Sequence, residues 1–253
     1  HTGLVMGNVL GSNIFNVAAI LGLSAICQPL IVKRNTTWLE IPLNLLVISV
    51  VAFLALDILI GSGDSNVITM SDGLILLSFF AIFLIYNIEL AIKGGEDTDI
   101  EEESMSNGKS AVFFFLGLIG LVAGGKLIVD NAVEIAESFG MSERIIGLTI
   151  VSVGTSLPEL AASVAAVRKG KVDIAVGNVI GSNIANIGLV FGATLVLAAI
   201  PINGSLVKKE IPLVVGVTLL AGFLMIDQHL SIIDGVVLII SFIAVLFILL
   251  RNS

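Results

Sequence analysis

The sequence predicts an all-α membrane protein with eight transmembrane helices, of ten expected for the complete architecture, in two repeats of inverted topology. Three observations predict this fold class. Of the 253 residues, 57% are hydrophobic and only 13% are charged, about half the charged fraction of a typical soluble domain. The apolar residues form runs near the ~20 residues that a helix needs to cross a bilayer. One half of the sequence also repeats the other.

Eight apolar runs follow one another, and each predicts one membrane-spanning helix. Their ranges are 4–27, 39–60, 72–92, 111–131, 145–167, 173–200, 210–228 and 231–250. Residues 93–110 contain six acidic residues and predict a solvated acidic linker. Seven basic residues are expected on the same side of the membrane as this linker and four on the opposite side, which predicts that the linker is cytoplasmic. The seven are Lys33, Arg34, Lys93, Lys109, Arg168, Lys169 and Lys171, and the four are Arg144, Lys208, Lys209 and Arg251.

The chain is an internal duplication. Segment 7–16, GNVLGSNIFN, matches segment 177–186, GNVIGSNIAN, at an offset of 170 residues, and residues 40–43 match residues 210–213 at the same offset. After a difference in loop length the offset becomes 162, so that Asp72 corresponds to Asp234. These matches divide the chain into an incomplete first repeat of three helices at 1–92, the linker at 93–110 and a second repeat of five helices at 111–253.

The number of helices in a complete repeat predicts how the two copies are oriented. Five crossings are an odd number, so the copies must run in opposite directions across the membrane. The first two helices of the second copy have no counterpart in the first, and the offset places those counterparts about 60 residues before His1. We therefore expect this chain to lack the first two helices of the ten.

The run GTSLPE at positions 154–159 places the carboxylate of Glu159 inside an apolar segment. A charge at that depth costs about 2.5–3.5 kcal/mol, so such residues mark ion paths by default. Pro158 clashes with the carbonyl of Gly154, which predicts a kink and freed carbonyl oxygens. Thr155 and Ser156 add hydroxyls, and an all-oxygen cluster is the ligand set that Ca²⁺ prefers. The alternative is a plain proline kink with a snorkelling or protonated Glu159.

Each copy also carries a polar stripe with side chains spaced by four residues. The stripes are Asn8, Ser12 and Asn16 in the first copy and Asn178, Ser182 and Asn186 in the second. Such side chains are costly against lipid, so they should face protein or an aqueous cavity. Symmetry with the Glu159 run favours cation ligands at the Ser and second Asn of each stripe. Asn8 and Asn178 can equally join helices through hydrogen bonds.

The remaining polar residues near the spanning runs have structural interpretations. Asp72 and Asp234 precede apolar runs and are predicted to be helix N-caps. Lys126 and Asp130 are four residues apart and are predicted to pair. Three further residues are expected near helix ends or in loops, where water is close: Asp57, Asp227 and His229.

The run at 154–159 followed by segment 177–186 resembles the alpha-repeat signature of the calcium/cation antiporter superfamily, and most of all prokaryotic sodium/calcium exchangers. The resemblance covers essentially the whole chain and implies ten helices in two inverted repeats, with cation sites at mid-membrane. Carried over by position, it implies ligand roles for Glu159, Thr155, Ser156, the carbonyl of Ser152, Ser182, Asn186, Ser12 and Asn16. The acidic motif of the first copy is absent, and Asn186 is an amide where some members have a carboxylate.

The resemblance implies an integral multi-pass antiporter of the prokaryotic plasma membrane that exchanges Ca²⁺ for Na⁺ by alternating access. Both ions are substrates, membrane lipid surrounds the protein, and no cofactor, nucleic acid or obligate protein partner is implied. H⁺- or K⁺-dependent exchange and a non-transporting truncated fragment are the alternatives, although the acidic-histidine pattern of the proton-coupled branch is absent. An enzyme is not expected, because an intramembrane hydrolase with Ser156 as nucleophile would lack a base. The two histidines, His1 and His229, lie outside the spanning runs.

Overall fold

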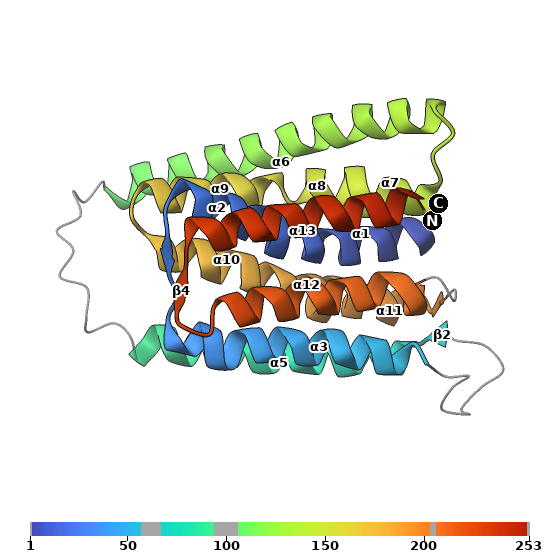
Figure 1. Ribbon diagram of the computed structural model, residues 1–253, viewed down its shortest axis with the longest axis horizontal. Coiled ribbons are helices and arrows are strands. Elements are labelled where there is room, and N and C mark those ends of the chain that lie inside the picture. Colours follow the sequence, from blue (N-terminus) through green and yellow to red (C-terminus); the bar gives the residue numbers. More distant parts are fainter. Residues whose placement is uncertain (1, 57–66, 94–105, 203–205, 252–253) are drawn as a thin grey trace.

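The computed structural model describes residues 2–56, 67–93, 106–202 and 206–251, and nearly all of these are helical. Asp57, predicted near a helix end, lies outside the described residues. The helices run along the long axis of the molecule in stacked layers, with α6 (Asn107–Ser138) along one edge (Figure 1). Both termini lie at the same end of the bundle.

The described part of the first repeat contains three helical segments; here η denotes a π-helical turn. The first is a continuous helix of α1 (Thr2–Ile14), η1 (Phe15–Ile20) and α2 (Leu21–Cys27), because both junctions keep right-handed helical angles. The second consists of η2 (Thr36–Glu40) and α3 (Ile41–Leu54), and the third is α5 (Met70–Lys93).

The second repeat begins with α6 and continues through four further segments. In chain order these are α7 (Glu143–Ile146), η3 (Gly147–Val151), α8 (Ser152–Thr155) and α9 (Leu157–Arg168); α10 (Val172–Ala185), η4 (Asn186–Phe191) and α11 (Gly192–Leu197); η5 (Leu206–Glu210) and α12 (Ile211–Leu224); and α13 (Ile232–Arg251). Four two-residue strands join the helices: β1 (Leu30–Ile31), β2 (Val67–Ile68), β3 (Ile200–Pro201) and β4 (His229–Leu230).

The helices confirm the predicted class but shift several boundaries. Six helical segments of the described chain are long and apolar enough to cross a membrane, and a bent pair, Gly147–Thr155 with Leu157–Arg168, makes a seventh. The predicted run 210–228 is helical only over 206–224 and is not among them. The run 39–60 was extended too far, because its helix ends at Leu54. The run 111–131 was too short, because α6 already begins inside the predicted linker.

The two repeats run in opposite directions, as predicted. The helix α1–α2 runs away from the end that carries the termini, whereas its counterpart α10–α11 runs toward it (Figure 1). β1 pairs antiparallel with β4, with Leu30 opposite Leu230, and β2 pairs with β3, with Ile68 opposite Ile200. Under the offsets of 170 and 162, β1 corresponds to β3 and β4 to β2. Each strand pair therefore joins the repeats, and each is the pseudo-symmetric image of the other.

Two close helix crossings repeat the same symmetry. Gly22 of α2 lies against Gly235 of α13, where an added Cβ on Gly235 would come within 2.7 Å of the Gly22 carbonyl oxygen. Gly192 of α11 lies against Gly73 of α5, where a Cβ on Gly73 would come within 2.7 Å of the Gly192 carbonyl oxygen. Backbones can approach this closely only at residues without a side chain, which explains why both copies carry these glycines.

The starts of α5 and α13 correct the predicted N-caps. The Asp234 carboxylate accepts hydrogen bonds from the backbone N–H and hydroxyl of Ser231 (2.8 and 2.7 Å), and Ser231 Oγ accepts one from Asp234 N–H (3.2 Å). Ser231 is therefore the cap, and Asp234 closes a reciprocal capping box from three residues further on. Asp72 likewise accepts bonds from the N–H and hydroxyl of Thr69 (2.7 and 2.8 Å).

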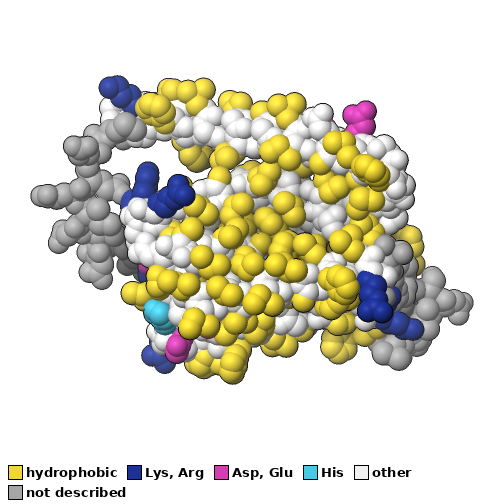
Figure 2. Space-filling view, turned by 45° about the horizontal axis from the view of Figure 1, so that its top comes forward, with side chains coloured by type: hydrophobic (Ala, Val, Ile, Leu, Met, Phe, Trp, Pro, Cys, Tyr) yellow, Lys and Arg dark blue, Asp and Glu magenta, His cyan; other side chains and the backbone are white. Residues whose placement is uncertain are grey.

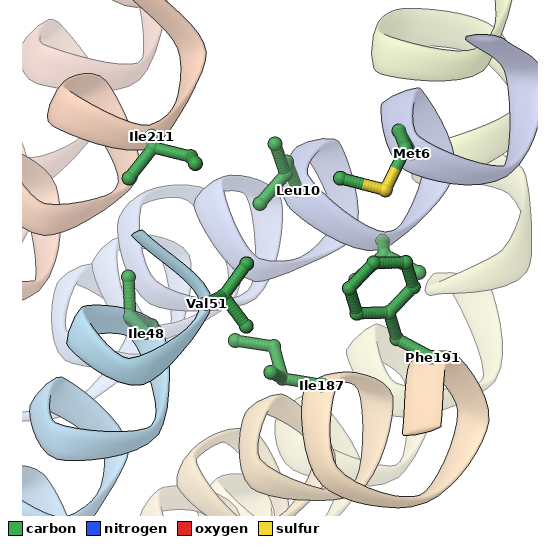
Figure 3. A pocket seen from close by; sticks show the side chains of 8 residues that line it. Met6, Leu10, Ile48, Val51, Ile187, Phe191 and Ile211 are labelled. Atoms are coloured by element: carbon green, nitrogen blue, oxygen red, sulfur yellow. The ribbon is translucent and has the colours of Figure 1, made fainter. Parts of the chain in front are cut away.

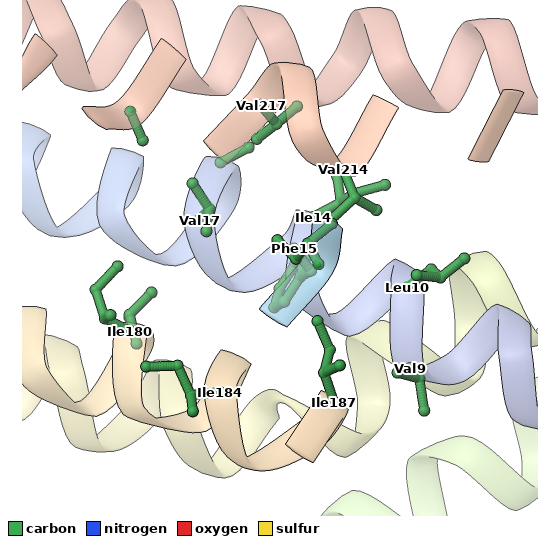
Figure 4. Close-up of a cluster of buried hydrophobic side chains, with 14 of the residues drawn as sticks. Val9, Leu10, Ile14, Phe15, Val17, Ile180, Ile184, Ile187, Val214 and Val217 are labelled. Atoms are coloured by element: carbon green, nitrogen blue, oxygen red, sulfur yellow. The ribbon is translucent and has the colours of Figure 1, made fainter. Parts of the chain in front are cut away.

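Apolar side chains from both repeats fill the interior. Figure 4 shows side chains of the first helix between those of α10–η4 and those of α12. The ring of Phe15 meets that of Phe242 edge to face at 5.5 Å. Figure 3 shows one end of the interior, where apolar side chains enclose a void too narrow for a water molecule: Met6, Leu10, Ile48, Val51, Ile187, Phe191 and Ile211.

The outer surface is apolar along much of the bundle. Many large hydrophobic side chains of α5, α6 and α13 are exposed, including Phe113, Phe247 and Ile240. In the view of Figure 2 hydrophobic side chains cover the middle of the molecule, and charged ones gather toward its ends. A bilayer would cover this apolar band, because such a surface is too large to leave in water. The fold is that of a multi-pass membrane protein.

Candidate functional site

The predicted proline kink is present and lies at Ser156. The segments Gly147–Thr155 and Leu157–Arg168 meet at an angle of 48°. Ser156 leaves the helical region with φ −97° and ψ 4°, and Pro158 lies in the first turn of the following helix. A Cβ on Gly154 would collide with Val129 of α6. The break is therefore packed directly against α6.

Glu159 follows the break and is half-buried. Its Oε2 atom is buried and has no hydrogen-bond partner among the described residues. The amide of Asn178 donates hydrogen bonds to the Glu159 carbonyl oxygen (3.2 Å) and to the hydroxyl of the fully buried Ser163 (3.0 Å). Asn178 thus ties α10 to α9 beside the carboxylate, which favours its helix-joining role. One carboxylate oxygen remains available for a cation.

The polar stripe of the first helix contacts both motifs of the second repeat. Thr155 Oγ1 donates a hydrogen bond to Asn8 Oδ1 at 3.0 Å and approaches the Ser152 carbonyl oxygen at 3.3 Å. The amide of Asn186 donates to Ser12 Oγ at 3.2 Å. These contacts place four of the predicted ligand residues at the junction of three helical segments: Thr155, Ser152, Asn186 and Ser12.

Asn13 and Asn183 complete this junction, although the sequence analysis did not single them out. Asn16 Nδ2 donates to Asn183 Oδ1 at 3.0 Å, and Asn183 Nδ2 donates to the Asn13 carbonyl oxygen at 3.2 Å. All three side chains are fully buried, and Asn13 Oδ1 and Asn16 Oδ1 have no hydrogen-bond partner among the described residues. Asn13 and Asn183 occupy the same place in the duplicated segment, and that identity was the signal by which they could have been found.

The other predicted ligands have less defined surroundings. Ser152 Oγ donates to the carbonyl oxygens of Leu148 and Thr149 (2.7 and 3.1 Å), so only its own carbonyl faces Thr155. Ser156 is buried at the break. The hydroxyl of Ser182 is half-buried and makes no hydrogen bond within the described part of the chain. The contacts within the described chain do not bring all eight predicted ligands together, so their shared role as ligands is a prediction.

Charge is sparse at this junction. No group of three or more His, Cys, Asp or Glu side chains that could hold a metal occurs within the described residues. A cation here would be held by one carboxylate and by neutral hydroxyl, amide and carbonyl oxygens. Such oxygens suit Na⁺ and Ca²⁺, which are hard cations, and they do not suit Zn²⁺, which prefers nitrogen and sulfur.

The pseudo-symmetric counterparts Gly11 and Gly181 have different surroundings. A Cβ on Gly11 would lie 2.5 Å from the Leu148 carbonyl oxygen and 2.6 Å from Ser152 Oγ, so the helix carrying Glu159 lies directly on Gly11. A Cβ on Gly181 would meet only Phe83 Cζ, at 3.9 Å. The face of α10 that corresponds to the occupied face of α1 is open in the described chain.

Lys126 and Asp130 do not form the predicted pair. Within the described residues neither makes an ion pair shorter than 4.0 Å. Both instead line a cavity of about 290 Å³ between α6 and the kink, together with Gly154, Thr155 and Pro158. Unpaired charges at membrane depth require a hydrated or protein-lined space, so this cavity brings polar groups close to Thr155.

Three further residues lie outside the junction: Asp227, His229 and Glu210. Asp227 and His229 are exposed as predicted, and Asp227 Oδ1 accepts a hydrogen bond from the His229 N–H at 3.0 Å. Glu210, the last residue of η5, has a side chain that is only 1% exposed.

Three features together define a class of membrane protein. They are an inverted repeat of apolar helices, a helix broken beside an intramembrane carboxylate, and polar stripes that meet at the break. They are the features of secondary transporters, in which discontinuous helices form the site at the repeat interface.

Comparisons with known proteins identify the family. The sequence matches the family described as sodium/calcium exchanger protein over residues 1–89 and 109–251, and the chain belongs to this family. It is 39% identical over 198 residues to the inner membrane protein YrbG of Escherichia coli (strain K12), which is 75% of this chain and 58% of YrbG. It is 40% identical over 190 residues to the membrane protein MJ0091 of Methanocaldococcus jannaschii, which is 74% of this chain and 58% of that protein.

A solved structure has the same fold. The sodium-calcium exchanger NCX_Mj, in crystals soaked with Na⁺ and Sr²⁺, superposes with a TM-score of 0.74 at 33% identity, covering 96% of this chain and 76% of that chain. The chain thus spans most of this exchanger, but little more than half the length of YrbG and MJ0091.

Proposed function

We propose that the protein is a secondary antiporter of the prokaryotic plasma membrane that exchanges Ca²⁺ for Na⁺ by alternating access. The observation that carries this proposal is the unpartnered, buried Oε2 of Glu159 beside the break at Ser156. Carboxylates at this depth mark ion paths by default, because burying their charge is costly. A cation neutralises it, and the neighbouring oxygens complete the coordination shell.

In this proposal the ligands come from both repeats. Glu159 supplies the negative charge, and Thr155, Ser156 and the Ser152 carbonyl supply oxygens from the broken helix. The remaining oxygens come from the two polar stripes: Ser12, Asn16, Ser182 and Asn186. Their hydrogen bonds across the junction support this assignment, because they already hold Thr155 against Asn8 and Asn186 against Ser12. Na⁺ and Ca²⁺ then compete for one oxygen-lined site, which couples their movements.

The described site is one half of a pseudo-symmetric whole. The open face at Gly181 supports this, since its counterpart at Gly11 is covered by the helix that bears Glu159. We propose that a further helix, equivalent to 143–168 and bearing a second acidic group, occupies the open face in the active transporter. This helix would belong to the two that the repeat comparison predicts before His1. The chain by itself would then transport poorly.

The coupling ion follows from the charge of the site. Sodium is favoured because the ligands are neutral oxygens around one carboxylate, and the two histidines, His1 and His229, lie away from Glu159 in the sequence. Exchange coupled to H⁺ or dependent on K⁺ is the second candidate. The residue at position 186 affects the choice between these candidates, because a carboxylate in place of the Asn186 amide would add charge for another cation.

The test is Ca²⁺ uptake into proteoliposomes driven by an outward Na⁺ gradient. The purified chain is compared with a polypeptide that includes an upstream segment of about 60 residues, the length that the repeat offset predicts. We expect uptake from the longer polypeptide only, with collapse of uptake when Na⁺ is equal on both sides. Uptake that persists without a Na⁺ gradient but follows a pH gradient would replace Na⁺ with H⁺. Full uptake from the 253-residue chain would contradict the half-site proposal.

A further inference from the structure

A large cavity lies away from the Glu159 junction, between α6 and the helices α2 and α9. It has a volume of about 800 Å³, within the range of ligand sites in proteins. Gly120 and Gly124 of α6 line it, and an added Cβ on either would meet nothing within 4 Å. In Figure 2 a hollow separates α6 from the body of the molecule, with basic side chains close to it.

The walls of this groove are apolar and one end is cationic. Leu160, Ala161 and Val164 of α9 line it opposite Leu23 of α2 and the glycines of α6. Arg168 and Lys169 line the end where α9 stops, and no acidic residue contributes to the lining. The groove is therefore built for a ligand with a long apolar part and an anionic group at one end.

Neither cation has a side-chain partner among the residues that the structure describes. Lys33, at the same end of the bundle, is held by Asp173 at 2.9 Å. Arg168 and Lys169 are exposed and make no side-chain hydrogen bond or ion pair within the described part of the chain. Two adjacent, unpaired basic groups form a strong site for phosphate, to which Arg in particular can bind in a bidentate manner.

The length of the groove matches one leaflet of a bilayer. It extends along α9 from Arg168, at the end of the helix, to Leu157, beside the break. The rise of about 1.5 Å per residue gives about 16 Å from Leu157 to Arg168, close to half of the ~30 Å hydrocarbon core. A chain of these dimensions is the acyl chain of a lipid whose phosphate stays at the headgroup level.

We propose that this groove binds a phospholipid with an anionic headgroup, with an acyl chain against α9 and the glycine face of α6 and the phosphate on Arg168 and Lys169. Basic pockets between transmembrane helices recognise anionic headgroups in this way. The occupant is a lipid and not free phosphate, because most of the lining is apolar. The lipid would hold α6 at a fixed distance from the helix that bears Glu159.

Native mass spectrometry of the delipidated chain tests this proposal, with phosphatidylglycerol and phosphatidylcholine of identical acyl chains as probes. We expect retention of phosphatidylglycerol at concentrations about thirtyfold lower than phosphatidylcholine, as two interfacial cations predict. The double variant R168Q/K169Q should lose this preference. The matched variant K208Q/K209Q removes a tandem basic pair, also exposed, from η5 and should keep it.

Two further arms separate the alternatives. Ala161→Phe fills the apolar part of the groove and leaves both cations, so it should also weaken retention of phosphatidylglycerol, whereas inorganic phosphate should not displace the lipid. Equal retention of the two lipids, or equal retention by wild type and R168Q/K169Q, would overturn the proposal. So would displacement by inorganic phosphate or failure to retain any lipid. Thermal unfolding of each variant confirms that the fold is intact.

Discussion

A matched pair of substitutions at Gly11 and Gly181 tests the pseudo-symmetry and the open face together. The two glycines correspond at the offset of 170 and differ only in what lies on them. We expect Gly11→Ala to destabilise the chain and Gly181→Ala to stabilise it. The same chemical change at equivalent positions would thus have opposite signs.

The magnitudes follow from the distances. A methyl group at Gly11 would lie 2.5 Å from the Leu148 carbonyl oxygen, about 1 Å short of an ordinary contact. Overpacking of this kind costs about 1–3 kcal/mol, offset by about 1 kcal/mol from the better helix propensity of alanine. The net loss is up to about 2 kcal/mol. At Gly181 the nearest atom, Phe83 Cζ, is 3.9 Å away, so only the gain of about 1 kcal/mol remains.

Thermal unfolding in detergent measures the difference. For a chain of this length 1 kcal/mol corresponds to about 2–4 °C in Tm, so the two variants should differ by several degrees. In a polypeptide that carries a further helix on the open face, Gly181→Ala should become as destabilising as Gly11→Ala. A destabilised Gly181→Ala in the 253-residue chain would refute the open face, and an unchanged Gly11→Ala would refute the packing distance.

Four other predictions concern the junction and the helix ends. Glu159→Gln should abolish Na⁺-driven Ca²⁺ uptake in the transporting polypeptide with folding retained, while Glu137→Gln, at an exposed site on α6, should transport normally. Uptake should fall as the pH is lowered, because protons and cations compete for the carboxylate of Glu159; uptake that is constant down to pH 4 would contradict this. Asn186→Asp should raise the Tm increase caused by Ca²⁺, since it adds a second charge, and an unchanged increase would place this residue outside the site. Ser231→Ala should cost about 1 kcal/mol of stability by removing a helix cap, measurable as a lower Tm.

The backbone architecture could be predicted from the sequence, because the duplication and the proline can both be read directly from the residues. Pro158 predicted a break near Gly154, and the helix breaks at Ser156 with a 48° bend. The offsets predicted inverted copies, and the pairing of β1 with β4 and of β2 with β3 follows the same offsets. The strands themselves were not predicted, because two-residue strands form only when the two repeats meet.

Helix ends and polar partners were predicted less well. An apolar run measures the thickness of hydrocarbon and not the length of a helix, so α6 continues to Ser138 through a more polar final stretch. Asp72 was interpreted as a cap because acidic residues are common there, whereas its carboxylate accepts hydrogen bonds from the N–H and hydroxyl of Thr69, a contact that depends on geometry. Lys126 and Asp130 have the spacing of an ion pair, but both side chains instead line the cavity beside Thr155.

The asymmetry at the centre of the molecule predicts how the second access state differs from this one. The pseudo-two-fold relates Asn13 to Asn183, yet the two amides bond differently. Asn183 Nδ2 crosses to the Asn13 carbonyl oxygen, whereas Asn13 Nδ2 returns to the Val9 carbonyl oxygen of its own helix at 2.7 Å. If alternating access exchanges the conformations of the two repeats, Asn13 must then cross to Asn183, and Asn183 must return to Val179.

The acceptors for such an exchange are already free. Asn16 now donates to Asn183 Oδ1 and Asn186 to Ser12 Oγ; their images would be Asn13 Oδ1 and the Ser182 hydroxyl, and neither has a partner within the described chain. We therefore expect Asn183→Ala, which removes two cross-repeat bonds of about 1 kcal/mol each, to shift the population toward the opposite access state. Asn13→Ala, which removes only an intrahelical bond here, should shift it toward the state described. Spin-label distances between α6 and α10 measure the populations, and equal shifts by the two variants would show that this hydrogen-bond exchange does not accompany transport.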